Sequence, residues 1–436
     1  TIDRTFCLPL ALIPAGNNFY WSYPAAELRH HRAEPGEAGS RRSCPMKNPR
    51  YITSIEDLPG IPGEEKKRLA EVTKKFAFRT NEYYASLIDW DDPEDPIRKI
   101  IIPDPRELEE WGALDPSNEK DYTVAPGVQH KYRETALFLT LDVCGGFCRF
   151  CFRKRLFMKR ADEIAHDLSA GIDYVRQHPE ITNVLLTGGD SLLLATRRLE
   201  RIISQIREID HVQIIRIGSK MAAFNPYRIL NDPDLPRLIK TYSTPEKKIY
   251  LMAHFNHPRE LTPQAIDALE VLRDAGAIVV NQTPLLRGIN SDPAQLTELF
   301  KKLSFIGVPP YYVFQCRPTI GNSLFGMPVE ESYLVFEKAR ASCSGLAKRA
   351  RFVISHASGK IEVVGKTDTA TYFKYHQAAD PRDIGRFLAF KSNPEAFWFD
   401  DYTDLLEDSR VFSDEDKQFP AFPSGRQIPN DTQAAG

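Results

Sequence analysis

Short apolar runs alternate with helical patterns from residue 136 to 315, and this alternation constrains the possible fold more than any other feature. Strands that alternate with helices pair in parallel through right-handed crossovers. The pattern predicts an α/β fold built on an open or partial (β/α)6 barrel. The predicted strands are ALFLTLD (136–142), NVLLTG (183–188), VQIIRIG (212–218), IYLMA (249–253), AIVVN (277–281) and PYYVFQ (310–315). The predicted helices lie near 162–177, 195–208, 233–241, 263–275 and 293–305.

Unusual polar clusters follow each of these strands. The second to sixth strands are followed by TGGD, IGSK, AHFNHP, NQTPLLRGIN and QCRPTIGN, and a cysteine-rich loop follows the first. The carboxyl ends of parallel strands meet at one edge of a sheet, where active sites of such folds lie. The sequence therefore predicts one site built from all six clusters.

The loop after the first strand contains Cys144, Cys148 and Cys151 in the run LDVCGGFCRFCFRKR. Three thiols this close favour a metal site over disulfides. Cubane iron–sulfur clusters normally take four cysteines, so three leave one iron open for a small molecule. The spacing C-x-x-x-C-x-x-C is typical of radical S-adenosylmethionine (SAM) enzymes. The alternative is a zinc site or three unrelated thiols, but the remaining cysteines stand singly at Cys7, Cys44, Cys316 and Cys343.

Composition narrows the class further. The chain has 436 residues, enough for one large domain with appendages or for two domains. A formal net charge of −2 gives no reason to expect nucleic acid as a partner. No apolar run approaches the roughly 20 residues of a membrane span. An oxygen-sensitive cluster needs a reducing compartment, so we expect a cytoplasmic enzyme with a small-molecule substrate.

Four regions are predicted. Residues 1–45 have no sustained period and are expected to be a leader that is not native or is disordered, with the native start at Met46. Residues 46–130 form a helical and connector region, and 131–343 form the core. Residues 344–436 form an extension that begins with a β hairpin and ends in a disordered tail from about Pro423.

The ordered series of motifs from about residue 76 to 376 resembles the lysine 2,3-aminomutase family of the radical SAM superfamily. The motifs are FRTNEYYASLID, PGVQHKY, the cysteine loop, LLTGGD, IRIGS, HFNHPREL, NQTPLLRGIN, PYYVFQC and FVIS. The resemblance implies a [4Fe-4S] cluster, SAM, pyridoxal phosphate (PLP) and a 1,2-amino shift. It also implies an electron donor of the flavodoxin or ferredoxin type, and multimers.

Carried over by position, the resemblance implies that Cys144, Cys148 and Cys151 bind the cluster. It places the SAM contacts at Gly188, Gly189, Asp190, His254 and Gln282. Arg153 matches the arginine that pairs with the substrate carboxylate, a geometry that suits guanidinium. The alternative for Arg153 is a solvated member of the basic RKR run.

The PLP region departs from the family. No glycine-rich lysine loop precedes FVIS, and Lys348 is the nearest lysine in that register. Lys360 resembles the loop lysine superficially, but the alignment on FVIS assigns it to a downstream position. The family's RYPDR reads KYRET here, so Tyr132 and Lys131 remain while Thr135 replaces an arginine and Arg133 is the only substitute nearby.

The substrate position departs too. Lysine-specific members carry an Asp after QC, where this chain has Arg317. A guanidinium would repel a substrate ammonium and would suit an anion. Lysine is therefore excluded as the expected substrate. Three readings stay open: an aminomutase with PLP, a PLP-independent radical elimination, epimerisation or rearrangement, and a non-catalytic iron–sulfur or zinc protein.

Overall fold

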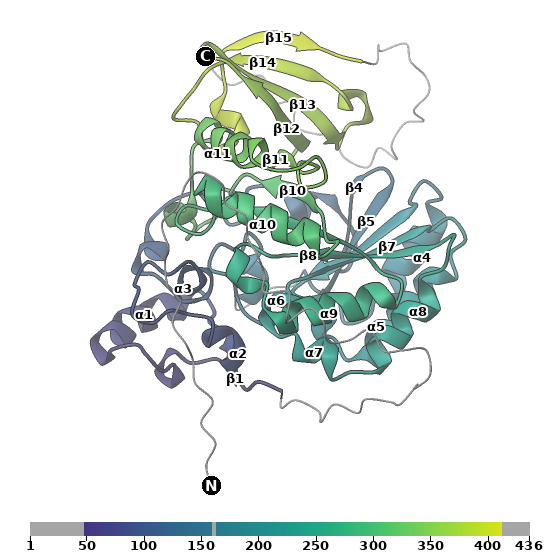
Figure 1. The fold of residues 1–436 in the computed structure, drawn as a ribbon. Coiled ribbons are helices and arrows are strands. Elements are labelled where there is room, and N and C mark those ends of the chain that lie inside the picture. Colours follow the sequence, from purple (N-terminus) through teal and green to yellow (C-terminus); the bar gives the residue numbers. More distant parts are fainter. Residues whose placement is uncertain (1–47, 159–162, 412–436) are drawn as a thin grey trace. The chain divides into compact units, whose positions relative to one another are not determined.

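The computed structural model describes residues 48–158 and 163–411, and a sheet of 13 strands dominates this part of the chain (Figure 1). Its hydrogen-bonded order follows the sequence from β3 to β15. The parallel strands are β5 (Thr135–Leu141), β6 (Asn183–Gly188), β7 (Ile214–Ser219), β8 (Lys248–Ala253), β9 (Ile278–Pro284), β10 (Pro310–Phe314) and β11 (Arg351–Ser355). The antiparallel strands are β3 (Thr123–Ala125), β4 (Val128–Tyr132), β12 (Gly359–Lys366), β13 (Ala370–Ala378), β14 (Phe387–Lys391) and β15 (Leu405–Ser409).

This large mixed sheet confirms the α/β prediction, whereas the barrel curvature stays a prediction. All six predicted strands are present, and β6 matches its predicted bounds residue for residue. The sequence FVIS forms β11, which pairs in parallel with β10 and antiparallel with β12. It is therefore a seventh parallel strand as well as the first strand of the predicted hairpin.

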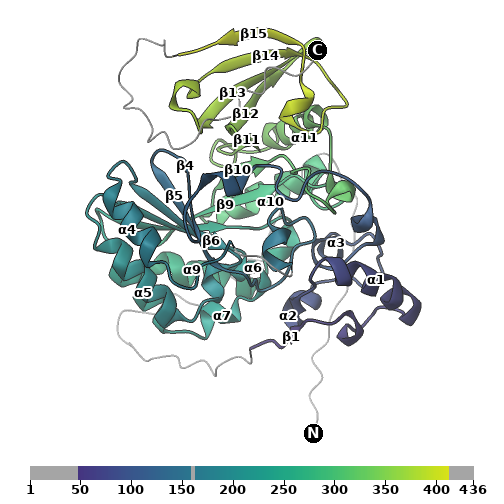
Figure 2. The same cartoon turned by 180° about the vertical axis from the view of Figure 1, so that it is seen from behind.

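Helices follow the parallel strands as the pattern predicts. Figure 1 shows α5, α8 and α9 gathered along the same side of the sheet, and Figure 2 shows α5 and α9 there from behind. Thr262 caps α9 by accepting a hydrogen bond from the Ala265 amide, and Gly276 ends it with a φ of 99°. The core helices are α4 (Ser169–Gln177), α5 (Thr196–Arg207), α6 (Met221–Phe224), α7 (Tyr227–Leu230), α8 (Asp234–Tyr242), α9 (Pro263–Asp274), α10 (Pro293–Phe305) and α11 (Val329–Ala341).

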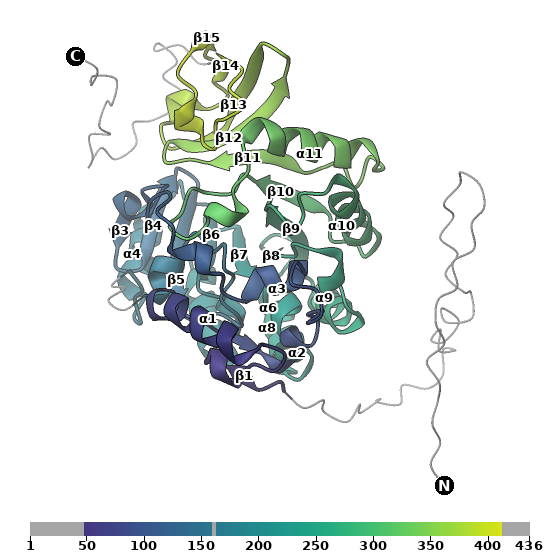
Figure 3. The ribbon, with the colours of Figure 1, turned by 90° about the vertical axis from the view of Figure 1, so that its left-hand side faces the viewer.

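The N-terminal helices form a second hydrophobic core with the cysteine loop. These helices are α1 (Gly63–Lys75), α2 (Glu82–Ala85) and α3 (Pro96–Ile101), and a small sheet of β1 (Tyr51–Ile52) and β2 (Thr80–Asn81) joins them. Tyr84 and Ile97 are fully buried in this core, which includes Phe150 from the cysteine loop. Figure 3 shows α1 and α3 lying in front of the parallel strands. The boundary predicted at residue 130 for this helical region stays a prediction.

Several predictions lie outside the described residues. The leader 1–45 and the tail from Pro423 both fall there. In the ranges that the structure does describe, no helix has the length and apolar character that crossing a membrane requires.

Candidate active site

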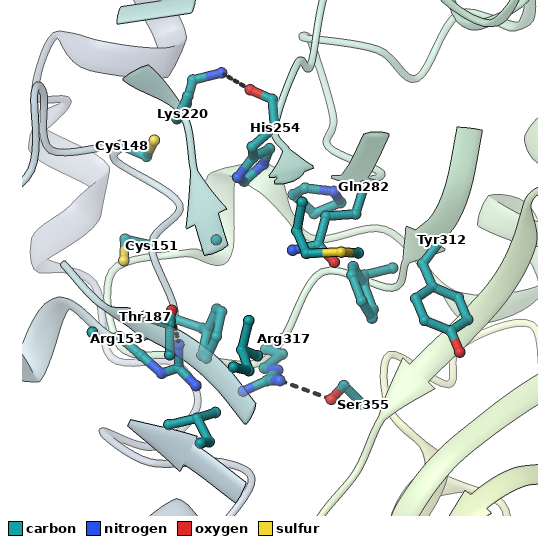
Figure 4. Close-up of a pocket in the computed structure, with 18 of the residues that line it drawn as sticks. Cys148, Cys151, Arg153, Thr187, Lys220, His254, Gln282, Tyr312, Arg317 and Ser355 are labelled. Carbon is teal, nitrogen blue, oxygen red and sulfur yellow. Dashed lines mark hydrogen bonds between the residues drawn. The ribbon is translucent and has the colours of Figure 1, made fainter. Parts of the chain in front are cut away.

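A cavity of about 320 Å³ is lined by strands β4 to β12 and by the loops at the carboxyl ends of the parallel strands. Figure 4 shows its labelled side chains pointing toward a shared space, with Cys148 and Cys151 on one side and Tyr312 and Ser355 on the other. Residues from all six predicted polar clusters line it. The parallel arrangement therefore brings together the segments that the sequence analysis singled out.

Cys144, Cys148 and Cys151 are free thiols in the loop after β5, and all three line the cavity. Neighbouring backbone holds this loop: the Phe147 amide donates to the Arg79 carbonyl at 2.9 Å, and the Arg149 amide donates to the Ile100 carbonyl at 2.8 Å. Burial raises the pKa of Cys148 to about 12, so the thiol keeps its proton until a metal replaces it.

The thiols do not converge on one point. Within residues 48–158 and 163–411, no three His, Cys, Asp or Glu side chains are grouped closely enough for a single metal ion. A cubane cluster places each thiolate on a different iron, so its ligands need no common point. The donor set of three cysteines on one cavity wall fits such a cluster.

The basic run after the cysteines is buried. Arg153, Lys154 and Arg155 are between 5% and 8% exposed, so the alternative of a solvated run is wrong. Lys154 donates to the Arg149 carbonyl at 2.8 Å, and Arg155 pairs with Glu163 at 3.0 Å. These contacts attach the cysteine loop to the surrounding structure.

The GGD segment lies directly against the cysteine loop. Gly188 has a φ of 108°, and the Asp190 amide donates to the Val143 carbonyl at 3.0 Å. Both carboxylate oxygens of Asp190 accept backbone hydrogen bonds, from Leu192 at 3.1 Å and from Lys220 at 2.7 Å. Burial raises the pKa of Asp190 to about 6.

Replacing Gly189 by alanine should disturb this junction. An added Cβ would lie 2.3 Å from the Val143 carbonyl oxygen, and backbone atoms cannot rotate away. We expect the Gly189→Ala variant to lose about 1–3 kcal/mol of unfolding free energy, as overpacked sites do, and to bind less iron. Thermal unfolding and iron content measure both effects. Gly63→Ala is the control because its Cβ would meet nothing within 4 Å, and equal behaviour of the two variants would contradict the expectation.

His254 and Gln282 line the cavity next to this junction, and both are seen in Figure 4. Burial lowers the pKa of His254 well below its usual value, so the imidazole is neutral. The Nε2 atom of His254 lies 3.2 Å from the side-chain amide nitrogen of Asn256. The Lys220 ammonium donates to the backbone carbonyl of His254 at 3.0 Å.

In another part of the cavity, two arginines lie beside the carboxylate of Glu119, a residue that the sequence did not single out. Arg153 donates from Nε and Nη2 to Glu119 at 3.0 and 2.9 Å. Arg317 lies 3.6 Å from Glu119, donates to the Ser355 hydroxyl at 2.8 Å, and stacks on Phe152. No short-range motif marks Glu119, which belongs to a polar segment of the connector region.

Three further cations line the cavity with neutral acceptors only, among the described residues. Lys131 donates to the His356 carbonyl at 2.5 Å, Arg216 to Asn183 at 2.9 Å and Lys360 to Gln377 at 2.9 Å. The ammonium groups of Lys131 and Lys360 lie 5.6 and 4.4 Å from the centre of the Tyr132 ring. Arg133 does not line the cavity, so it is not the substitute considered for the missing arginine.

Burial and mutual repulsion act on these amines. Burial lowers the pKa of Lys360 well below its usual value, and Arg216, Lys131 and Arg317 lower it further. Burial, with Arg317, lowers the pKa of Lys131 to about 7. This part of the cavity therefore contains reactive amines and unneutralised positive charge.

Lys348, the lysine that the sequence suggested for PLP, lies apart from the other predicted site residues. It does not line the cavity and lies instead beside α11, next to Arg340 and Glu362. Lys348 precedes β11, whereas the cavity opens at the carboxyl ends of the parallel strands. The five residues of β11 span roughly 16 Å, which is more than a lysine side chain can reach.

Comparisons with known proteins agree with the motif series. No protein-family model matches the chain. A protein of Aquifex aeolicus named "Putative L-lysine 2,3-aminomutase" is 58% identical over 82% of this chain and 96% of its own length. The L-lysine 2,3-aminomutase of Clostridium subterminale is 37% identical over 76% of this chain and 78% of that protein. The glutamate 2,3-aminomutase of Clostridioides difficile is 35% identical over 68% and 70%, respectively. The chain therefore belongs to the lysine 2,3-aminomutase family of radical SAM enzymes.

Proposed function

We propose that this enzyme holds a [4Fe-4S] cluster with Cys144, Cys148 and Cys151 and performs a 1,2-amino shift on an amino acid that carries a second anionic group. When bound, the cluster supplies the electron that cleaves SAM, and the resulting 5′-deoxyadenosyl radical removes a hydrogen atom from the substrate. The observation that carries this proposal is one cavity lined by three thiols, by Arg153 and Arg317, and by the buried Lys360. A flavodoxin or ferredoxin as electron donor belongs to the same proposal.

SAM binding is assigned to the residues nearest the cysteine loop. Gly188 and Gly189 let the backbone approach a ligand closely. Asp190 accepts backbone amides on both oxygens and a hydrogen bond from the Ser219 side chain, and its remaining acceptor position would receive the ammonium of SAM. Neutral His254 and Gln282 supply polar edges for the adenosyl group.

The substrate is assigned from charge. Arg153 has five N–H donors, of which Glu119 and Thr187 take three, so one donor stays on each terminal nitrogen. That pair can receive the α-carboxylate, and Arg317 can receive a distal anion. A substrate ammonium beside Arg317 would be repelled, which argues against lysine. The relative named glutamate 2,3-aminomutase supports an acidic amino acid.

PLP fits the cations that have no carboxylate partner. Lys131 and Arg216 would hold its phosphate, and Lys360 would be the lysine that carries it. When bound, PLP delocalises the unpaired electron during the amino shift. Lys360 thus replaces Lys348 in the proposal, although it stands on a different strand from the family lysine.

Borohydride reduction tests this assignment. The anaerobically reconstituted enzyme, incubated with PLP and reduced, should carry a pyridoxyl label on Lys360 in peptide mass spectra. Lys360 should label faster than an exposed lysine at the same pH, because burial and the nearby cations lower its pKa well below the usual value and a larger fraction of its amine is unprotonated.

Lys348→Ala should label like the wild type, and Lys360→Ala should not label. A label on Lys348 would contradict the proposal. SAM cleavage without any label would mean that the enzyme retains radical chemistry and works without PLP, by elimination, epimerisation or rearrangement.

A further inference from the structure

The carboxylate of Glu119 is shared by three guanidinium groups. Arg153 binds it through two nitrogens, Arg155 donates from Nη2 at 2.9 Å, and Nη1 of Arg317 lies 3.6 Å away. The Glu119 side chain is 11% exposed. One acid therefore connects the cysteine loop, which carries Arg153 and Arg155, to the loop after β10, which carries Arg317.

The charges of the neighbouring arginines keep the Glu119 carboxylate ionised. Burial alone would raise the pKa of Glu119, but Arg153, Arg317 and Arg155 hold that pKa well below its usual value, so the group stays ionised. Without its charge the guanidinium groups would repel one another in a desolvated site. Arg153 and Arg317 would then move apart or turn toward other acceptors.

The segment that carries Glu119 is itself attached on both sides of this residue. The Ser117 hydroxyl donates to the Ser355 carbonyl at 2.8 Å, and the Tyr122 hydroxyl donates to the Ala357 carbonyl at 2.8 Å. Both acceptors lie at the carboxyl end of β11, beside the cavity. These bonds suit a fixed orienting group better than a mobile carboxylate that competes with the substrate.

Glu119 also determines which donors face the ligand. Glu119 binds Nε and Nη2 of Arg153, so the donors that remain for a ligand are one N–H group on each terminal nitrogen. Nη1 of Arg317 is buried and has no hydrogen-bond partner. Two guanidinium groups held beside one carboxylate thus offer unpaired donors to a short molecule with two acidic groups.

We propose that Glu119 is a positioning residue that makes the cavity selective for a dicarboxylic amino acid by fixing Arg153 and Arg317 at a short separation. This inference deepens the proposed function and rests on it for the identity of the substrate. It assigns Glu119 no contact with the reacting atoms.

The first test needs no substrate. Holoenzyme loaded with cluster and SAM is treated with phenylglyoxal, and the rate of modification of each arginine is measured by peptide mass spectrometry. In Glu119→Gln the rate at Arg153 should rise several-fold, since its paired face is released. Glu163→Gln is the matched control, because Glu163 binds Arg155 but does not line the cavity, and it should leave Arg153 unchanged.

The second test measures L-glutamate binding to the same holoenzyme by calorimetry. Glu119→Gln should raise the Kd about tenfold or more while iron content and SAM affinity stay unchanged, and Glu119→Asp should recover part of the loss. Tighter binding of L-glutamate by Glu119→Gln would overturn the proposal, because it would make Glu119 a competitor. Equal Arg153 modification in the wild type and Glu119→Gln would overturn it too. If the wild type ignores L-glutamate, the substrate assignment fails, and the selectivity claim fails with it, whereas faster Arg153 modification would still support the positioning role.

Discussion

Replacing Cys148 by alanine is expected to abolish the cluster and SAM cleavage. Only Cys144 and Cys151 would remain in the loop. Cys316 lines the same cavity but follows β10 and is not part of the loop, and Cys343 lies outside the cavity. Loss of an outer partner of a metal ligand already costs 10- to 100-fold in metal affinity. Loss of a ligand itself should therefore reduce the rate of 5′-deoxyadenosine formation by more than about a hundredfold.

The measurements are iron and sulfide per chain, visible absorbance, and 5′-deoxyadenosine after reduction with dithionite. Cys343→Ala is the matched control, because Cys343 donates only to the Ala339 carbonyl and lies outside the cavity. The control should resemble the wild type in all three measurements. Normal SAM cleavage by Cys148→Ala would remove the basis for the proposed function.

Replacing Arg317 by aspartate is expected to give the second large effect. The new carboxylate would stand beside Glu119, so an attractive position for a distal anion would become a repulsive one. Loss of one member of a buried charge pair costs 2–5 kcal/mol or more, which corresponds to a fall in kcat/KM of about thirtyfold to several thousandfold. Cluster content and SAM binding should be unaffected.

Steady-state kinetics on the true substrate check this expectation, with L-glutamate as the first compound to try. Arg351→Asp serves as the control, since Arg351 is exposed on β11 and pairs with Glu362 away from the cavity. A normal kcat/KM for Arg317→Asp would show that Arg317 does not contact the substrate. Iron content and thermal unfolding identify a variant that simply fails to fold.

The parts of the fold that could be predicted are those whose causes are local. The strand NVLLTG is a short apolar run, and α9 has a capping Thr262 and a terminal Gly276, so the sequence predicts both elements. Helix α11 was missed because its pattern is weakly amphipathic: it buries Glu330, whose carboxylate accepts hydrogen bonds from Thr371 and Ser392. That burial depends on strands more than 40 residues further along the chain.

Helix α3 is another element that the sequence did not predict. Its stretch is interrupted by prolines, which argue against a helix, yet Asp95 caps it and Pro96 occupies its first turn. Strands β14 and β15 were also missed, because β15 is exposed along its whole length and gives no apolar signal.

The site residues also divide into those that a sequence motif predicts and those that only the fold brings together. The three cysteines and GGD are contiguous motifs, and the alternation of strands and helices predicted that they would meet. Glu119 precedes β3 and Lys360 lies on β12, more than 200 residues later, so only the folded chain brings them to one cavity. The sequence did not place Lys348 relative to the cavity, because alignment on FVIS gives its sequence distance from β11 but not which end of the strand its side chain reaches.

The attachment of the cysteine loop has a consequence for how the enzyme is matured. Arg149 pairs with Glu107 and bonds to the Ala77 carbonyl, while Asn322 donates to the Phe150 carbonyl, so protein contacts alone hold the loop. None of these bonds uses a thiol group, so we expect the loop to fold before the proposed cluster is bound. All three thiols line the cavity, so we expect the cluster to be inserted from the cavity before SAM and substrate occupy it.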